Sequence, residues 1–154
     1  MPQSTWYQKR ENHADHVVYL DKKAKELQKM LDHQKTMIIR GAAGKKVPLG
    51  GRVKQDDILY FVETGSDLLI THRALVKKVI ETNQMTEEES VAFVEKYQKE
   101  LMLAPHQHIR WAGKKYLCLI EIHQLESIEP FQYRREKNMD DWIIVDDIND
   151  IKIL

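Results

Sequence analysis

One segment that changes from strand-like to loop-like limits the folds open to this chain. Residues 35–40, Lys-Thr-Met-Ile-Ile-Arg, have the apolar centre of a β-strand, and residues 41–53 then supply four glycines. Residues 35–54 contain six cations and no carboxylate, so an anion that approaches this loop meets one sign of charge. Glycine lets backbone N–H groups come close to a ligand because it has no Cβ. The segment predicts a strand followed by an anion-binding loop, and a solvated basic turn is the alternative.

The anion-binding hypothesis gives roles to named residues. Arg40 can hold a phosphate through its planar guanidinium, and Lys35 can act as a point charge. In a regular strand these two side chains point to opposite faces, because they are an odd number of residues apart. Surface charge is therefore the alternative for both. The ligand-binding residues predicted from this segment are Lys35, Thr36, Arg40, Gly41, Lys45, Lys46 and Arg52.

A second candidate segment, residues 110–116, interleaves cations with aromatic residues. This arrangement lets bases stack on rings while phosphates are neutralised. Arg110 and Trp111 therefore join the predicted ligand-binding residues, with Trp111 as the stacking platform. Burial of Trp111 in the core is the alternative, because large aromatic side chains are usually well buried.

Composition limits the class of protein. The 154 residues suit a single domain spanning 1–154, with an irregular N-terminal arm at 1–15 and a C-terminal extension at 126–154. The 24 basic and 24 acidic residues cancel, which argues against a wholesale polyanion binder. The single cysteine, Cys118, excludes an internal disulfide and fits a reducing compartment. No apolar run reaches membrane-spanning length, so we expect a cytoplasmic protein without a membrane partner.

Hydrophobic periodicity predicts five strands and two helices. Strands are expected at 17–20, 36–40, 57–62, 69–79 and 116–124, with a bulge or bend in the fourth. A first helix is expected at about 22–32, capped by Asp21. A second helix is expected at about 87–101, because Thr86 and Glu89 form a capping box, and Pro105 prevents its continuation. Strands and helices do not alternate regularly, so the pattern predicts an α+β domain with a small curved sheet or barrel.

Other reactive residues point to no further site. His106 and His108 are spaced so that they could share a metal, but no other ligands are identifiable, and we expect neither metal nor cofactor. Asp140 and Asp141 could bind a divalent cation or pair with Arg40 or Arg52. An exposed acidic turn is the preferred interpretation, and a buried pair with a cleft arginine, with Trp142 as hydrophobic anchor, is the next choice.

Two motifs resemble the ASCH family of the PUA-like superfamily. In that family a Lys-Thr-x-x-x-Arg strand follows a short helix, as residues 35–40 do here, and a Gly-Asp-x-hydrophobic strand begins soon after, as residues 56–61 do. Asp56 stands where the family has glycine. The resemblance covers residues 17–125. It implies a PUA-like small mixed β-barrel with two or more flanking helices, and a cleft beside the first helix lined by the Lys-Thr-x-x-x-Arg strand.

The resemblance also implies a function. ASCH members are mostly inferred to bind RNA or modified bases, and some are amidohydrolases that act on N4-acetylcytidine with a lysine base, a threonine nucleophile three positions later and a glutamate proton donor. Here the lysine is Lys35 but the nucleophile position holds Ile38, which has no oxygen to attack an acyl carbon. We therefore disfavour that enzyme and expect an RNA- or modified-nucleotide-binding protein. The alternatives are a hydrolase of a modified nucleoside with Lys35 as base, and a protein-interaction module.

Overall fold

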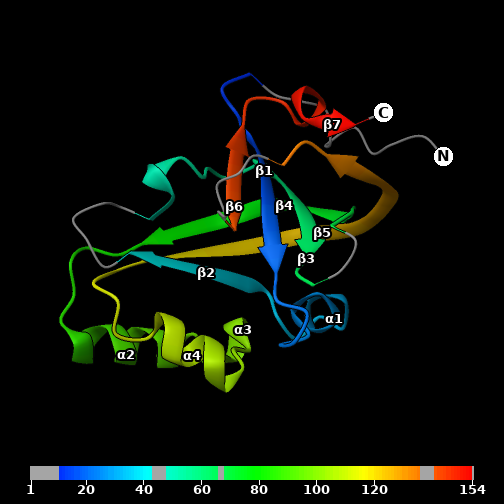
Figure 1. The fold of residues 1–154 in the computed structure, drawn as a ribbon. Coiled ribbons are helices and arrows are strands. Elements are labelled where there is room, and N and C mark those ends of the chain that lie inside the picture. Colours follow the sequence, from blue (N-terminus) through cyan, green and yellow to red (C-terminus); the bar gives the residue numbers. More distant parts are fainter. Residues whose placement is uncertain (1–10, 43–47, 66–67, 136–140, 154) are drawn as a thin grey trace.

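A strongly curled mixed sheet forms the body of the protein, as the computed structural model shows (Figure 1). The model describes residues 11–42, 48–65, 68–135 and 141–153. The strands are β1 (Asp15–Leu20), β2 (Met37–Ala42), β3 (Ile58–Glu63), β4 (Ile70–Glu81), β5 (Tyr116–Tyr133), β6 (Trp142–Val145) and β7 (Lys152–Ile153). The helices are α1 (Glu26–Leu31), α2 (Glu87–Lys96), α3 (Gln98–Leu101) and α4 (Pro105–Trp111), with short 3-10 turns η2 (Pro48–Gly51) and η3 (Ile148–Asp150).

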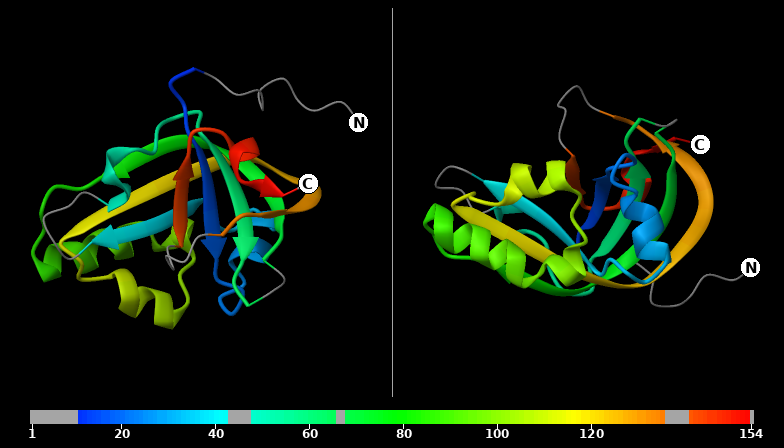
Figure 2. Two further views of the ribbon diagram at one scale, coloured as in Figure 1. Left: turned by 45° about the horizontal axis from the view of Figure 1, so that its top comes forward. Right: turned by 90° about the horizontal axis from the view of Figure 1, so that it is seen from below.

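The strand order makes the sheet a half-barrel with two edges. The order is β2-β5-β4-β3-β1-β6, and β7 pairs with β5. Only the β1–β3 pair among the described strands is parallel. The long strands β4 and β5 bend around the body of the molecule (Figure 2), and their register shifts at three places, which confirms the irregularity predicted for residues 69–79. The edge strands β2 and β6 are therefore the two sides of an opening.

Alternate residues of β2 face two different hydrophobic clusters. Ile38 packs inside the curled sheet with Phe61 and Ile120. Ile39 faces the other way and packs with Leu101 and Trp111, which come from the helices. Side chains alternate across a strand, so one short apolar run serves both layers. Helices α2, α3 and α4 lie together on one side of the sheet (Figure 1).

The first helix is shorter than its periodicity predicts. It begins at Glu26, not near Lys22, because Lys25 has the left-handed conformation with a φ of 56°. The predicted cap residue, Asp21, instead accepts a hydrogen bond from the backbone N–H of Ala24 at 3.1 Å and so holds a turn before the helix. Hydrogen bonds from an aspartate side chain to nearby backbone N–H groups compete with helix initiation.

The second predicted helix is divided, and a third follows it. The capping box at Thr86 and Glu89 is confirmed, with distances of 3.0 and 3.1 Å between the paired groups. Tyr97 separates α2 from α3, and the left-handed Met102 ends α3. Pro105 does not simply follow a helix end, because it occupies the first turn of α4, where its missing N–H costs nothing. This helix was not predicted, and it carries Arg110 and Trp111.

Strands and helices are combined in one sheet-and-helix body, which confirms the predicted α+β class. Residues 126–153 contribute the second half of β5 together with β6 and β7. Among the described residues, no helix has the length and apolar character needed to cross a membrane.

Candidate functional site

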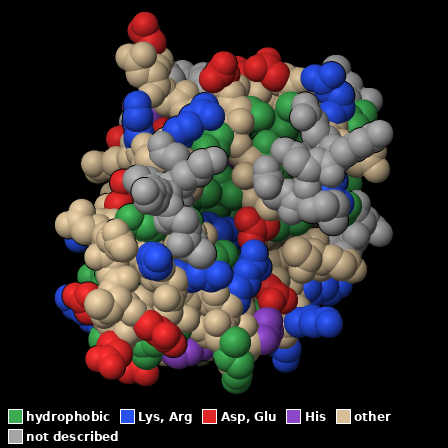
Figure 3. All heavy atoms as spheres, turned by 60° about the vertical axis from the view of Figure 1, so that its left-hand side comes forward, with side chains coloured by type: hydrophobic (Ala, Val, Ile, Leu, Met, Phe, Trp, Pro, Cys, Tyr) green, Lys and Arg blue, Asp and Glu red, His purple; other side chains and the backbone are tan. Residues whose placement is uncertain are grey.

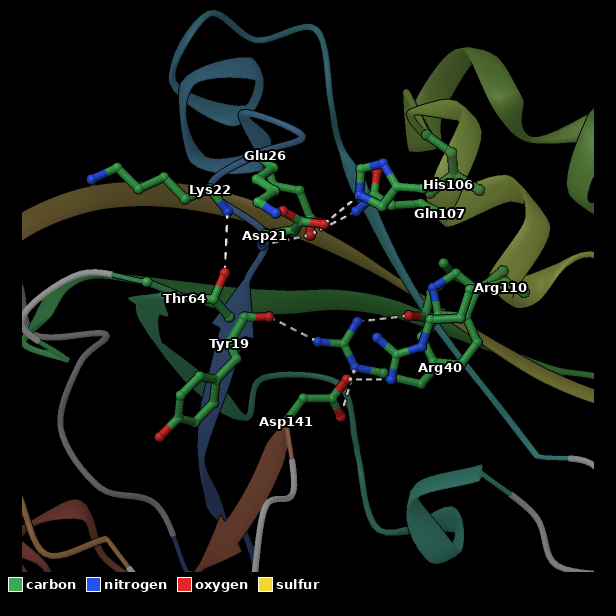
Figure 4. Close-up of a pocket in the computed structure, with 15 residues that line it drawn as sticks. Tyr19, Asp21, Lys22, Glu26, Arg40, Thr64, His106, Gln107, Arg110 and Asp141 are labelled. Carbon is green, nitrogen blue, oxygen red and sulfur yellow. Dashed lines mark hydrogen bonds and ion pairs between the residues drawn. The ribbon is translucent and has the colours of Figure 1, made fainter.

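A cavity of about 640 Å³ lies beside α1, where β1 and β3 end and α4 passes the edge strand β2. Its volume falls within the range of small-molecule sites, about 300 to 1,000 Å³. Its polar and aromatic walls are shown in Figure 4. The lining side chains that can hydrogen-bond or stack are Tyr19, Asp21, Lys22, Lys23, Glu26, Arg40, Thr64, His106, Gln107, Arg110, Trp111 and Asp141.

Arg40 crosses the opening of the half-barrel. It comes from edge strand β2, and its Nη2 donates to the carbonyl of Tyr19 on β1 at 3.0 Å. Its Nε lies 3.4 Å from Oδ1 of Asp141, the residue before β6. Its guanidinium lies 5.9 Å from the ring centroid of Trp111 and 5.4 Å from that of Trp142, and the residue is buried. Arg40 therefore holds both sides of the opening together at the cavity wall.

Trp111 and Arg110 form the wall contributed by α4. Trp111 is only 7% exposed and belongs to the helix-side hydrophobic cluster, although it also lines the cavity. The guanidinium of Arg110 lies 4.4 Å from the centroid of this ring, while 61% of the Arg110 side chain is exposed. Its Nη2 is 3.2 Å from Oδ2 of Asp141. Most of the Trp111 indole is therefore buried, as the alternative interpretation of this residue expects. The accessible cationic surface at this wall comes from Arg110.

A network of four side chains joins α4 to the turn before α1. Nε2 of His106 lies 2.6 Å from Oδ2 of Asp21. Oε1 of buried Glu26 accepts from Nε2 of Gln107 at 2.9 Å and from the backbone N–H of Asp21 at 2.9 Å. Several hydrogen bonds to one carboxylate stabilise its charged form and fix its orientation. The pKa of the Asp21 carboxyl lies below its usual value; burial opposes this shift, while hydrogen bonds from His106 and the backbone cause it.

Lys35 lies behind this network and does not line the cavity. Its Nζ is 3.5 Å from Oε2 of Glu26 and donates to the carbonyl of Leu101, and the residue is 2% exposed. Burial lowers the pKa of Lys35 to about 8, against an opposing contribution from Glu26. Thr36 is also outside the cavity, and both residues border a separate hollow of about 360 Å³. Of the predicted pair Lys35 and Arg40, the structure places only Arg40 at the cavity.

The predicted glycine-rich loop is only partly described. Lys45 and Lys46 lie outside the described residues. Arg52 is exposed and lines a different hollow beside residues 11–14, so it does not join Arg40. Gly41 belongs to β2, and a Cβ placed there would lie 2.9 Å from Leu117 Cδ2 and 3.1 Å from Trp111 Cε3. Its absent side chain therefore lets the indole lie close to the strand.

Charges around the cavity are mixed, since basic and acidic side chains line it together: Lys22, Lys23, Arg40 and Arg110 with Asp21, Glu26 and Asp141. On the face shown in Figure 3, basic side chains gather next to acidic ones, so this face is not uniformly cationic. Within residues 11–42, 48–65, 68–135 and 141–153, no group of three or more His, Cys, Asp or Glu side chains is arranged to hold a metal ion.

Comparisons with known proteins place the fold. No family model matches the chain, and a search of curated proteins finds no match. Among solved structures, ASCH from Zymomonas mobilis superposes with a TM-score of 0.56 at 13% identity, over 77% of this chain and 73% of that one. A serine-to-alanine variant of that protein gives 0.57 at 13% identity, over 79% and 75%. A tyrosine-to-phenylalanine variant gives 0.55 at 14% identity, over 77% and 75%.

The fold is ASCH-like. The predicted α+β architecture is confirmed, and its form here is a curled half-barrel. The cavity lies beside the first helix, and Ile39 and Arg40 of the Lys-Thr-x-x-x-Arg strand contribute to its wall. Ile38 is 1% exposed and packs in the interior of the half-barrel.

The departure from the ASCH motif at Asp56 has a backbone explanation. Asp56 has a φ of 72°, in the left-handed region that favours glycine and that aspartate tolerates better than most residues. The next residue, Asp57, is fully buried and its Oδ2 lies 2.8 Å from Nε2 of His16. It also accepts from the backbone N–H of Lys54 at 3.0 Å. The first two residues of the second motif therefore have structural roles in this ASCH-like fold: Asp56 forms a turn, and Asp57 forms a buried polar pair with His16.

Nine of the cavity side chains that can hydrogen-bond or stack were not among the predicted ligand-binding residues: Tyr19, Asp21, Lys22, Lys23, Glu26, Thr64, His106, Gln107 and Asp141. The sequence contains one signal for the start of α4, which is Pro105 followed two positions later by Gln107. In the structure, Oε1 of Gln107 accepts a hydrogen bond from the backbone N–H of Ala104 at 3.0 Å. Asp140 lies outside the described residues. For Asp141, the contact with Arg40 agrees with the second choice made from the sequence, which was pairing with a cleft arginine beside a Trp142 anchor, and Trp142 is buried.

Proposed function

We propose that the protein binds RNA, or a nucleotide-like unit of RNA, in the cavity beside α1. The observation that carries this proposal is the combination of an accessible guanidinium, an indole and hydrogen-bonding side chains around one hollow of about 640 Å³. Arginine pairs with phosphate through parallel N–H groups, and bases are recognised by stacking and by hydrogen bonds to their edges. The ASCH-like fold supports the proposal because the sequence resemblance implies nucleic-acid or modified-base binding.

Each wall has a role in this proposal. Arg110 approaches the phosphate, because most of its side chain is exposed while its guanidinium remains stacked on Trp111. Arg40 is buried and holds the opening in shape. The exposed upper part of the cavity, where His106 pairs with Asp21, offers polar groups to a base or ribose.

The hydrolase alternative with Lys35 as base has less support. Its lowered pKa, about 8, suits a base, but Nζ is bonded to a carbonyl and lies behind Glu26. A general base must come within hydrogen-bond reach of the proton that it removes. Glu26 occupies the position between Lys35 and the cavity.

Binding of a fluorescently labelled single-stranded RNA, measured by anisotropy across a salt series, tests the proposal. We expect native binding to weaken steeply with salt, because phosphate neutralisation releases counterions. Arg110→Ala should weaken binding about tenfold, the effect of losing one charged hydrogen-bonding group. It should also reduce the log-log salt slope by about 0.7, the value for one phosphate contact on a single strand.

Two further variants make the result specific. Lys78 is exposed on β4, so Lys78→Ala should bind like the native protein. Arg52→Ala tests whether the glycine-rich segment contributes to RNA binding. Because Arg52 lines a different hollow, we expect this variant to bind RNA nearly as tightly as the native protein. Native affinity that does not change with salt, or an Arg110→Ala variant that binds as tightly as Lys78→Ala, would refute the proposal.

A further inference from the structure

One carboxylate is shared by the two arginines of the cavity. Asp141 places Oδ1 3.4 Å from Nε of Arg40 and Oδ2 3.2 Å from Nη2 of Arg110 (Figure 4). The backbone carbonyl of Asp141 also accepts from the N–H of Tyr19 at 3.0 Å. The main chain therefore fixes this carboxylate at the cavity wall, next to β1.

Arg40 needs this partner more than Arg110 does. The side chain of Arg40 is 9% exposed, and its Nη1 and Nη2 already donate to the carbonyls of Ile39 and Tyr19. A buried cation requires a counterion as well as hydrogen bonds. Arg110 is largely exposed, so water and ligand can reach its remaining N–H groups.

The shared carboxylate leaves this end of the cavity with one net positive charge, from two guanidinium groups and one carboxylate. A phosphodiester carries a single negative charge and is complementary to it. A polyphosphate places further negative charge beside Asp141, which is 35% exposed and faces the same hollow. Like charges brought together at a binding site cost free energy, and this cost suppresses binding of the wrong partner.

We propose that Asp141 is a specificity-determining residue that restricts the cavity to a singly charged phosphodiester unit and rejects nucleoside polyphosphates. The assignment rests on the proposed nucleotide binding and identifies its ligand class. Asp141 has a second effect in the same geometry, since it keeps the guanidinium of Arg40 neutralised and in place.

The test compares two uridine ligands, the dinucleoside monophosphate UpU and the nucleoside triphosphate UTP. Both are titrated calorimetrically into the full chain at one ionic strength, with a chelator present so that no divalent cation neutralises the triphosphate. We expect native protein to favour UpU by about tenfold, which corresponds to 1.4 kcal/mol. Asp141→Asn should raise the affinity for UTP at least severalfold and leave that for UpU little changed.

Controls separate charge from shape. Asp141→Glu retains the charge and should retain the preference for UpU. Glu88 is exposed on α2, so Glu88→Gln removes one charge elsewhere and should behave like the native protein. Thermal unfolding of each variant verifies folding, and a native protein without a preference for UpU overturns the assignment whether or not Asp141→Asn folds.

Two outcomes overturn the inference in different ways. Native protein that binds UTP as tightly as UpU, or an Asp141→Asn variant that loses affinity for both, removes the selective role of Asp141 while nucleotide binding stands. Native protein that binds neither ligand and no single-stranded RNA removes the proposed function together with the inference.

Discussion

Lys35 should make the stability of the protein depend on pH in a predictable direction. Burial lowers its pKa from 10.5 in an exposed chain to about 8 in the folded protein. Below pH 8 both the folded and the unfolded states carry the proton, so the folded state bears the full cost of burying the charge. Above pH 10.5 neither state carries it, and the cost has disappeared. Stability should therefore rise as pH increases through this window.

The size of the effect follows from the shift. A shift of one pKa unit corresponds to 1.36 kcal/mol, so the lowering from 10.5 to about 8 implies roughly 3 kcal/mol over the complete titration. Between pH 7 and pH 9 the folded state loses most of its proton while the unfolded state retains its own, which is worth about 1 kcal/mol. Burial also raises the pKa values of Cys118 and Tyr60 to about 12, and these two groups contribute equally to the native protein and to a Lys35 variant, so the difference between the two proteins isolates Lys35.

Urea unfolding at pH 7, 8 and 9 measures this increment. We expect the free energy of unfolding of the native protein to rise by about 1 kcal/mol more than that of Lys35→Met, which cannot titrate at this position. Lys78→Met removes an exposed lysine from β4 and should follow the native protein. Parallel pH profiles for the native protein and Lys35→Met would refute the reasoning, because the buried ammonium would then contribute nothing to the pH dependence.

Three further substitutions test individual contacts, each by thermal or urea unfolding. Trp142→Phe removes the indole N–H that lies 3.0 Å from Nδ1 of His16, and leaving this buried acceptor unpaired should cost about 1 to 3 kcal/mol; an unchanged midpoint would contradict it. Gly41→Ala should lower the free energy of unfolding by about 1 to 3 kcal/mol, because its Cβ would lie 2.9 Å from Leu117 Cδ2. An unchanged free energy of unfolding would mean that the neighbouring atoms move aside at no cost. Thr86→Ala removes the hydroxyl of the capping box and should cost about 1 kcal/mol, so a loss as small as that of an exposed surface substitution would argue against the cap.

Local chemistry in the sequence was sufficient for much of the fold. The capping box at Thr86 depends on two residues three positions apart, so it can be read without the tertiary structure. The interior of the half-barrel follows from alternation, as Ile38 and Ile120 show. Asp21 was misassigned as a helix cap because a helix start and an isolated turn both favour an aspartate that accepts from a nearby backbone N–H, and only the backbone of Lys25 distinguishes them.

The candidate site was harder to predict because its contacts join distant parts of the chain. Glu26 meets Gln107, and Arg40 meets Asp141, across separations that strand periodicity does not encode. Lys35 was chosen for its charge, but its side chain points into the protein toward Glu26. A cation in a basic segment can face solvent or a buried carboxylate, and the sequence pattern of that segment is the same in both cases.

The pairing of β1 with β6 has a consequence for the order of assembly. Asp15 is opposite Val145 and Val18 is opposite Trp142, so the outer side of β1 has this partner only after residues 142–145 have been synthesised. Pairing between segments so far apart in the sequence is slow, because the entropy cost of closing the long loop arises before the stabilising contacts form. While the polypeptide is still on the ribosome, β1 can already associate with β3, whereas the wall that contains Asp141 is completed only after β1 to β5 have been synthesised. The candidate cavity should therefore form late in biogenesis, after strands β1 to β5 are available.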